Sequence, residues 1–121
     1  MKPELSNLLV VEDNLFIGEK IVHAAKEVSG IKEVFLTEFL QEAISTLSNV
    51  NFKLIVLDLS LPDGNGIELL KWLKEKETTT KVLVFSTGVE LKQICLRYGA
   101  FAFFDKSKDF DKLIDTLKTL N

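Results

Sequence analysis

The segment LIVLDLSLPDGNGIELLKWL, residues 54–73, decides the fold of this chain. It opens with four consecutive apolar residues, a pattern typical of a strand that is covered on both faces of a sheet. It closes with Ile67, Leu70 and Leu73 at the spacing of one helical face. The DGNG stretch between them, residues 63–66, could form a type I′ hairpin turn. Because a helix follows directly, we expect a strand-to-helix loop there instead.

The same alternation of apolar run and helical pattern recurs along the whole chain. The runs lie at residues 8–11, 33–37, 54–58, 81–85 and 102–105, and the run at 33–37 is polar at both ends, which predicts an edge strand. The helical faces are Ile17, Ile21, Ala24 and Val28; Leu40, Ala43, Ile44 and Leu47; Ile67, Leu70 and Leu73; Leu91, Ile94, Cys95 and Tyr98; and Phe110, Leu113, Ile114 and Leu117. Such alternation requires right-handed crossovers, so the sequence predicts an α/β fold, a doubly wound (βα)5 unit with a five-stranded parallel sheet.

Composition narrows the class of protein. The length of 121 residues fits one domain over positions 1–121, with 46% hydrophobic and 27% charged residues, an ordinary globular balance. The net charge of −3 provides no basic field for nucleic acid or an anionic membrane, and no apolar run is long enough to cross a bilayer. The single cysteine, Cys95, excludes an internal disulfide. We therefore expect a small cytoplasmic domain with no output domain after it.

Polar side chains follow four of the predicted strands at the edge where function sits in an open parallel sheet. They are Glu12 and Asp13 after the first run, Asp58 at the end of the third, Ser86 after the fourth and Lys106 after the fifth. Each alone has an ordinary explanation, such as a helix cap or a solvated charge. Together they predict carboxylates, a hydroxyl and an ammonium that converge on one edge.

This set of groups suits phosphoryl transfer to a carboxylate. Clustered carboxylates repel each other, and a hard cation such as Mg²⁺ relieves the repulsion. A carboxylate can also accept a phosphoryl group and form an aspartyl phosphate, with a cation and a hydroxyl around the transferring oxygens. Asp58 then fits the nucleophile, Glu12 and Asp13 the metal ligands, and Ser86 and Lys106 the groups that bind the phosphoryl oxygens.

The chain resembles the receiver domain of two-component response regulators over essentially its whole length. The segments that carry the resemblance are LLVVED at 8–13, LIVLDLSLPDGNG at 54–66, VLVFS at 82–86 and GAFAFFDK at 99–106. The second is the most specific, because Asp58, Pro62 four residues later and Gly66 eight residues later all match. The resemblance implies a flavodoxin-like fold with strand order 2-1-3-4-5.

The resemblance also implies a role for each matching residue. Asp58 would accept a phosphoryl group from a phosphohistidine on a sensor histidine kinase or a histidine phosphotransfer protein. Glu12, Asp13, Asp58 and the backbone carbonyl of Ser60 would surround Mg²⁺ or Mn²⁺. The chain would be a regulatory phosphoacceptor rather than an enzyme, with only metal-dependent self-phosphorylation and autodephosphorylation.

The resemblance further implies a conformational switch. Ser86 and Lys106 would bind the phosphoryl oxygens, and Phe103 would change rotamer when Ser86 moves. The surface of the fourth helix, fifth strand and fifth helix would then shift between existing states. Since Phe103 has no hydroxyl, its change would be detected through packing alone. A phosphorylation-dependent dimer stays open.

Two departures from the family pattern concern the loops around the site. Ser107 follows Lys106 where the family often has proline, so we expect a trans bond there. The spacing from Ser86 to Gly99 is about two residues shorter than usual, which predicts a tight connection into the fourth helix.

Two outward stripes are candidate docking surfaces. One begins beside the acidic residues on the first helix, where a kinase or phosphotransfer protein could dock, and the other lies on the fourth helix as an output surface. The stripes are Leu15, Gly18 and Val22, and Val89, Lys92 and Leu96.

Three other functions are weighed against this hypothesis. A receiver-like adaptor that binds partners without phosphorylation usually lacks the acceptor, an acid or the lysine, and all are present here, but the short spacing into the fourth helix keeps this alternative open. A phosphatase with an aspartyl nucleophile needs a second acid two residues after the first, where this chain has Ser60. A flavin-binding flavodoxin needs a hydroxyl-rich phosphate loop, where this chain has Glu12 and Asp13.

Overall fold

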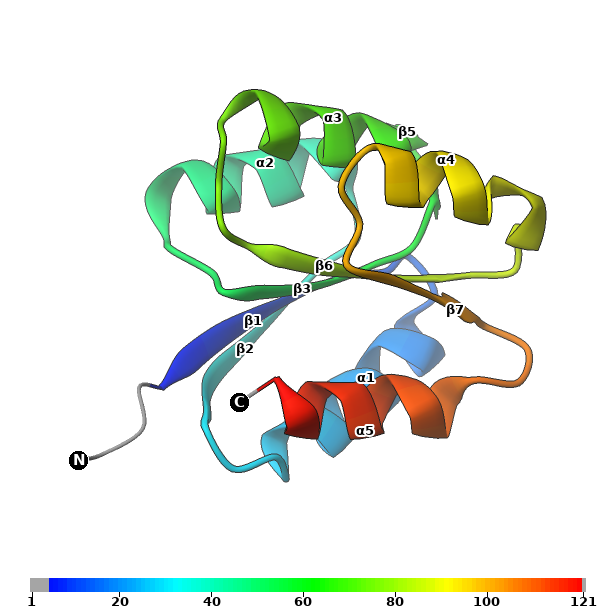
Figure 1. Ribbon diagram of the computed structural model, residues 1–121. Helices are drawn as coiled ribbons and strands as arrows, with labels where there is room; N and C mark the ends of the chain where they lie inside the picture. Colours follow the sequence, from blue (N-terminus) through cyan, green and yellow to red (C-terminus); the bar gives the residue numbers. More distant parts are fainter. Residues whose placement is uncertain (1–4, 121) are drawn as a thin grey trace.

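Five parallel strands form the sheet at the centre of the computed structural model, which describes residues 5–120 (Figure 1). The strands are β1 (Ser6–Val11), β2 (Ile31–Thr37), β3 (Leu54–Leu57), β6 (Lys81–Ser86) and β7 (Ala102–Asp105). They lie in the order β2-β1-β3-β6-β7, which confirms the predicted order 2-1-3-4-5 and places the polar-ended β2 at an edge. Val11 pairs with both Thr37 and Leu57, so these three strands end level with one another.

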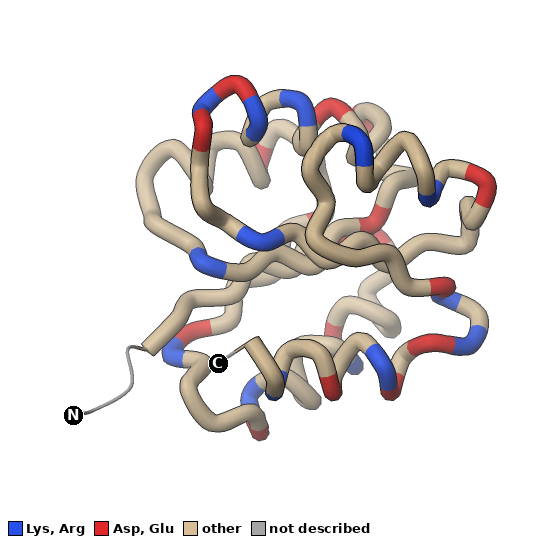
Figure 2. The backbone as a smooth tube through the Cα atoms, viewed as in Figure 1, with Lys and Arg blue, Asp and Glu red and all other residues tan. Residues whose placement is uncertain are grey.

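Helices cover both faces of this sheet. The helices α2 (Leu40–Asn49), α3 (Ile67–Glu75) and α4 (Lys92–Arg97) lie on one face, and α1 (Leu15–Lys26) and α5 (Phe110–Thr119) lie on the other (Figure 1). Acidic and basic residues are interspersed along α3 and α5, as expected for helices that face solvent (Figure 2). Among residues 5–120 there is no helix with the length and apolar character needed to span a bilayer.

The alternating side chains of the central strands fill two separate cores. In β1, Leu9 and Val11 pack toward the core under α2, α3 and α4, while Leu8 and Val10 pack toward the core under α1 and α5. All four side chains are fully buried. Burial on both faces is the reason that these strands are continuously apolar in sequence rather than alternating.

The loop after β3 contains a structure that the sequence did not predict. Ser60–Leu61 (β4) and Gly64–Asn65 (β5) form a small antiparallel hairpin, with the turn at residues 62–63. The expectation of a loop leading into a helix is confirmed, because α3 begins at Ile67, whose N–H donates to Asn65 Oδ1 at 2.8 Å. The type I′ turn considered for residues 63–66 is absent, because the hairpin turns at 62–63 and Gly64–Asn65 form its second strand.

The connection from β6 to α4 is short, as predicted. Only Thr87 and Gly88 separate β6 from a 3-10 helix, η1 (Val89–Leu91), which leads directly into the six residues of α4. Cys95 is fully buried, which confirms it as a core residue. Ile94 was expected on the same buried face, but it is 38% exposed, because so short a helix covers little of the sheet.

Candidate functional site

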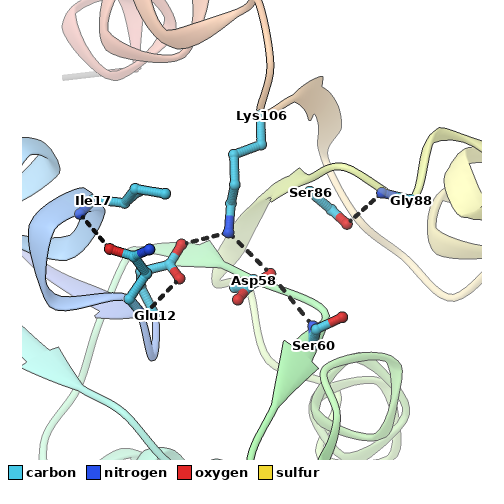
Figure 3. A network of polar contacts seen from close by, with 8 residues as sticks. Glu12, Ile17, Asp58, Ser60, Ser86, Gly88 and Lys106 are labelled. Atoms are coloured by element: carbon cyan, nitrogen blue, oxygen red, sulfur yellow. Dashed lines mark hydrogen bonds and ion pairs between the residues drawn. The ribbon is translucent and has the colours of Figure 1, made fainter.

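The predicted site residues gather at the carboxyl edge of the sheet. Glu12 and Asp13 follow β1, Asp58 follows β3, and Lys106 follows β7. Asn14 caps α1 by accepting a hydrogen bond from the N–H of Ile17 at 3.1 Å, which fixes the short loop that carries the two acids. Lys106 extends from its strand end toward Glu12 and Asp58 (Figure 3).

Three carboxylates form a cluster suited to a hard cation. Glu12, Asp13 and Asp58 each offer an oxygen, and these oxygens lie within 4.8 Å of one another. Glu12 is 1% exposed and Asp58 is 5% exposed, while Asp13 is open to solvent. Carboxylate oxygens are the ligands that Mg²⁺ and Mn²⁺ prefer. The cluster therefore has the donor chemistry of a divalent cation site with one side open to water.

Lys106 neutralises only part of this charge. Its Nζ lies 2.7 Å from Glu12 Oε1 and 3.2 Å from Asp58 Oδ1. Burying charges costs desolvation energy, so each buried carboxylate requires close partners. One ammonium faces two buried carboxylates and an adjacent third. The remaining negative charge is the physical reason that a divalent cation fits here.

The electrostatics of Asp58 reflect this imbalance. Burial raises the pKa of its carboxyl from the ordinary 3.8 to about 7, and the nearby charge of Glu12 adds to the rise. The ammonium of Lys106 acts in the opposite direction. The N–H of Ser60 also donates to Asp58 Oδ1 at 3.3 Å. A perturbed carboxyl at a strand end is a typical sign of a functional group.

Ser86 lies at the end of β6 and Phe103 lies in β7, as the sequence predicted. The hydroxyl of Ser86 is hydrogen-bonded within its own loop. Ser86 is buried, and its Oγ accepts a hydrogen bond from the N–H of Gly88 at 3.0 Å (Figure 3). Its carbonyl oxygen accepts from the backbone N–H of Lys106 at 3.0 Å, which joins the two strand ends. Phe103 is half-buried against the core under α2, α3 and α4.

The expected stripe on α1 is wrong for two of its three residues. Leu15 is 52% exposed, but Gly18 is buried, and a Cβ built on it would lie 3.0 Å from Leu36 Cδ1 of β2. Val22 is half-buried and packs on the core under α1 and α5. The sequence reasoning missed Phe16, which is 80% exposed. Polar residues three and four positions later were the available signal that Phe16 faces solvent.

The stripe on η1 and α4 is exposed as expected. Val89, Lys92 and Leu96 all face solvent. Their exposure makes them available for contact, and their docking role stays a prediction.

Asp63 was not singled out in the sequence, although it organises the loop next to the acids. Its two carboxylate oxygens accept hydrogen bonds from the N–H groups of Leu40 at 2.7 Å and Gln41 at 3.0 Å. The residue before α2, Phe39, provides no side-chain cap, so Asp63 serves as the cap from a distant loop. These bonds hold the pKa of the Asp63 carboxyl below its usual range.

Comparisons with known proteins agree with this geometry. The family model of the response regulator receiver domain matches residues 8–118. The transcriptional regulatory protein MalR of Bacillus subtilis is 32% identical over 108 residues, covering 88% of this chain and 46% of that protein. The cell cycle response regulator CtrA of Brucella ovis is 32% identical over 109 residues, with the same coverage. The chain therefore spans about half the length of these curated relatives.

Solved structures give the same result. The Francisella response regulator 1452 receiver domain has a TM-score of 0.85 at 28% identity, covering 95% of each chain. The response regulator protein TrrA of Thermotoga maritima, solved in complex with Mg²⁺ and BeF, has a TM-score of 0.84 at 25% identity, covering 97% of this chain and 100% of that chain. From its family match, its relatives and its sheet order, this chain belongs to the response regulator receiver domain family.

Proposed function

We propose that this chain is a phosphorylation-controlled switch that accepts a phosphoryl group on Asp58. The observation that carries the proposal is the position of Asp58: a buried carboxyl with a raised pKa, 3.2 Å from the ammonium of Lys106 and grouped with Glu12 and Asp13. Membership of the receiver family supports the same assignment. The chain acts in this proposal as a regulatory phosphoacceptor.

The chemistry is a transfer from a phosphohistidine to a carboxylate. An oxygen of the ionised Asp58 attacks the phosphorus, an O–P bond forms, and the N–P bond breaks. The electron pair of the broken bond stays on the imidazole nitrogen, which takes a proton from water. The product is a mixed anhydride on Asp58, and its phosphoryl oxygens carry the transferred negative charge.

The residues around Asp58 have complementary tasks. Lys106 shares its ammonium between Glu12 and Asp58, so it is placed to contact a phosphoryl group attached to Asp58. Glu12, Asp13, Asp58 and the backbone carbonyl of Ser60 would hold Mg²⁺ or Mn²⁺, which when bound supplies positive charge next to the phosphoryl oxygens. TrrA, similar to this chain in fold, was solved with Mg²⁺ and BeF, which favours this assignment.

The switch begins at Ser86 in this proposal. Its Oγ accepts a hydrogen bond from Gly88, and an accepting hydroxyl keeps its own proton to donate. Donation to a phosphoryl oxygen would draw Ser86 toward Asp58, and Phe103 would repack. Since Phe103 packs against the core beside α4, the surface of α4, β7 and α5 would shift with it.

The donor is in this proposal a sensor histidine kinase or a histidine phosphotransfer protein. Leu15 and Phe16 present exposed apolar side chains at the start of α1, directly after the acidic loop. Apolar groups beside a reacting site are a common basis for transient docking.

Labelling with acetyl phosphate tests the acceptor. The wild-type chain incubated with acetyl phosphate and millimolar Mg²⁺ is expected to gain one phosphoryl group by intact mass, and Asp58→Ala is expected to gain none. Asp111→Ala, an exposed acid on α5, is the matched control and should label like the wild type. An unmodified wild type would overturn the proposal and favour a phosphorylation-independent adaptor.

Thermal unfolding tests whether the acidic cluster binds a metal ion. Millimolar Mg²⁺ is expected to raise the melting temperature of the wild type by ligand linkage, and to raise that of Asp13→Ala less. Asp13 is exposed, so its removal leaves the core intact. Equal shifts in the two proteins would argue against Asp13 as a ligand.

A further inference from the structure

The loop that carries Lys106 is held by the carboxylate of Asp105. The backbone N–H and the side-chain O–H of Ser107 both donate to Asp105 Oδ1, at 2.9 Å and 2.6 Å. These two bonds reach across Lys106 and tie its neighbours together. They also hold the pKa of the Asp105 carboxyl below its usual range, so the carboxylate is charged at neutral pH.

A second set of bonds closes the same loop through the backbone. The N–H of Asp105 donates to Asp109 Oδ2 at 3.0 Å, and the N–H of Asp109 donates to the carbonyl oxygen of Asp105 at 2.8 Å. The end of β7 and the start of α5 are therefore joined reciprocally. The loop of residues 106–108 has its ends fixed on both sides.

These contacts fix the backbone position from which the side chain of Lys106 extends. Its backbone N–H is bound to the carbonyl oxygen of Ser86 at 3.0 Å, and the residue after it is bound to Asp105. Only the flexible side chain is left to bring Nζ to Asp58 and Glu12. A proline after Lys106 would restrict the backbone covalently, whereas serine restricts it only as long as its hydrogen bonds to Asp105 are made.

We propose that Asp105 is a positioning residue, which orients the loop so that the ammonium of Lys106 reaches Asp58 during phosphoryl transfer. This inference rests on the proposed phosphoacceptor function. Asp105 acts through Ser107 and Lys106. Misplacement of a reacting group by about 1 Å can cost about a hundredfold in rate.

The first test compares Asp105→Ala with Asp111→Ala, which makes the same charge change at an exposed position on the following helix. The rate of labelling by acetyl phosphate at saturating Mg²⁺ is expected to fall at least about tenfold in Asp105→Ala and to be unchanged in Asp111→Ala. Ser107→Ala removes the 2.6 Å bond and keeps the backbone bond, so its rate is expected to lie between the two. If Asp105→Ala does not fold, Ser107→Ala alone decides.

The second test separates positioning from general damage. In a Lys106→Ala background, Asp105→Ala or Ser107→Ala is expected to cause no further slowing, because the group that it positions is gone. Slowing by the same factor in both backgrounds would overturn the positioning role. If the wild type is labelled and all loop variants are labelled at the same rate, the positioning role of Asp105 is overturned and the proposed function stands. If the wild type is not labelled, the proposed function is overturned as well.

Discussion

Gly66 is the position at which a single added methyl group tests the close packing around the acceptor. Gly66 precedes α3 with φ −58° and ψ −20°, a helical conformation that alanine adopts freely. A Cβ there would lie 2.6 Å from the carbonyl oxygen of Asp58 and 3.1 Å from the Cα of Leu59. Both atoms belong to the backbone, so neither can rotate away.

Two opposing effects set the size of the change in stability. Replacing glycine with alanine at a compatible conformation stabilises a protein by about 0.4–1 kcal/mol, because the unfolded chain has less freedom to lose. Overpacking against an unyielding neighbour costs about 1–3 kcal/mol. The contact with Asp58 is too short to accept without a backbone shift, so we expect Gly66→Ala to lower the free energy of unfolding by about 1–2 kcal/mol.

Urea unfolding of Gly66→Ala beside Gly88→Ala measures this. A Cβ on Gly88 would lie 3.3 Å from Glu90 Oε1 and 3.4 Å from Leu91 Cδ1, and both are ends of side chains that can move. We expect the control to stay within about 0.5 kcal/mol of the wild type. A Gly66→Ala protein as stable as the wild type, or more stable, would refute the reasoning, because it would show that the loop relaxes at no cost.

Three further substitutions have directions fixed by the structure. Glu77 follows α3 with φ +53°, a left-handed conformation that favours glycine. Glu77→Gly is therefore expected to raise the free energy of unfolding, measured in urea, by about 1 kcal/mol. A lower free energy of unfolding in the variant would contradict this. The pKa of Asp63 is lowered on folding, so its carboxylate stabilises the fold above the ordinary pKa of 3.8, and this stabilisation is lost as the pH falls. Asp63→Asn should therefore be less stable than the wild type at pH 7, and the difference should shrink at acid pH. A difference that stays constant with pH would count against this. The pKa of Asp58 is raised on folding, so the wild type loses stability as the pH rises from 3.8 to about 7. In EDTA, Asp58→Asn should be more stable than the wild type at pH 8 and should approach the wild-type stability near pH 4. Equal stability at pH 8 would argue against a carboxylate that burial destabilises.

The sequence predicted the sheet and the acidic cluster because both follow from strand periodicity. In a parallel sheet all strands end at the same edge, so Glu12, Asp58 and Lys106 could be placed together from their positions after apolar runs. The β4–β5 hairpin escaped prediction, because strands of two residues are too short to have a period. Gly18 of α1 was misplaced, because its burial comes from Leu36 of β2, which the pattern along one helix does not reveal.

The contacts of the loops were equally out of reach. Asp63 caps α2 from 23 residues away, and no local pattern marks such a partner. The bonds of Asp105 to Ser107 depend on how the loop after β7 turns, which hydrophobic periodicity does not determine. Ile94 followed the helical spacing correctly, but α4 is too short for that face to be fully covered.

The packing of α4 allows the local opening of this part of the molecule to be measured with a residue of the native chain. Cys95 is the one buried side chain of the segment Val89–Arg97 and the only cysteine of the chain, and burial raises the pKa of its thiol. A thiol reagent can therefore modify it only when this segment detaches transiently. The rate of alkylation reports how often that happens, without any probe being introduced. Comparing the rate before and after acetyl phosphate treatment would time the release of this segment directly.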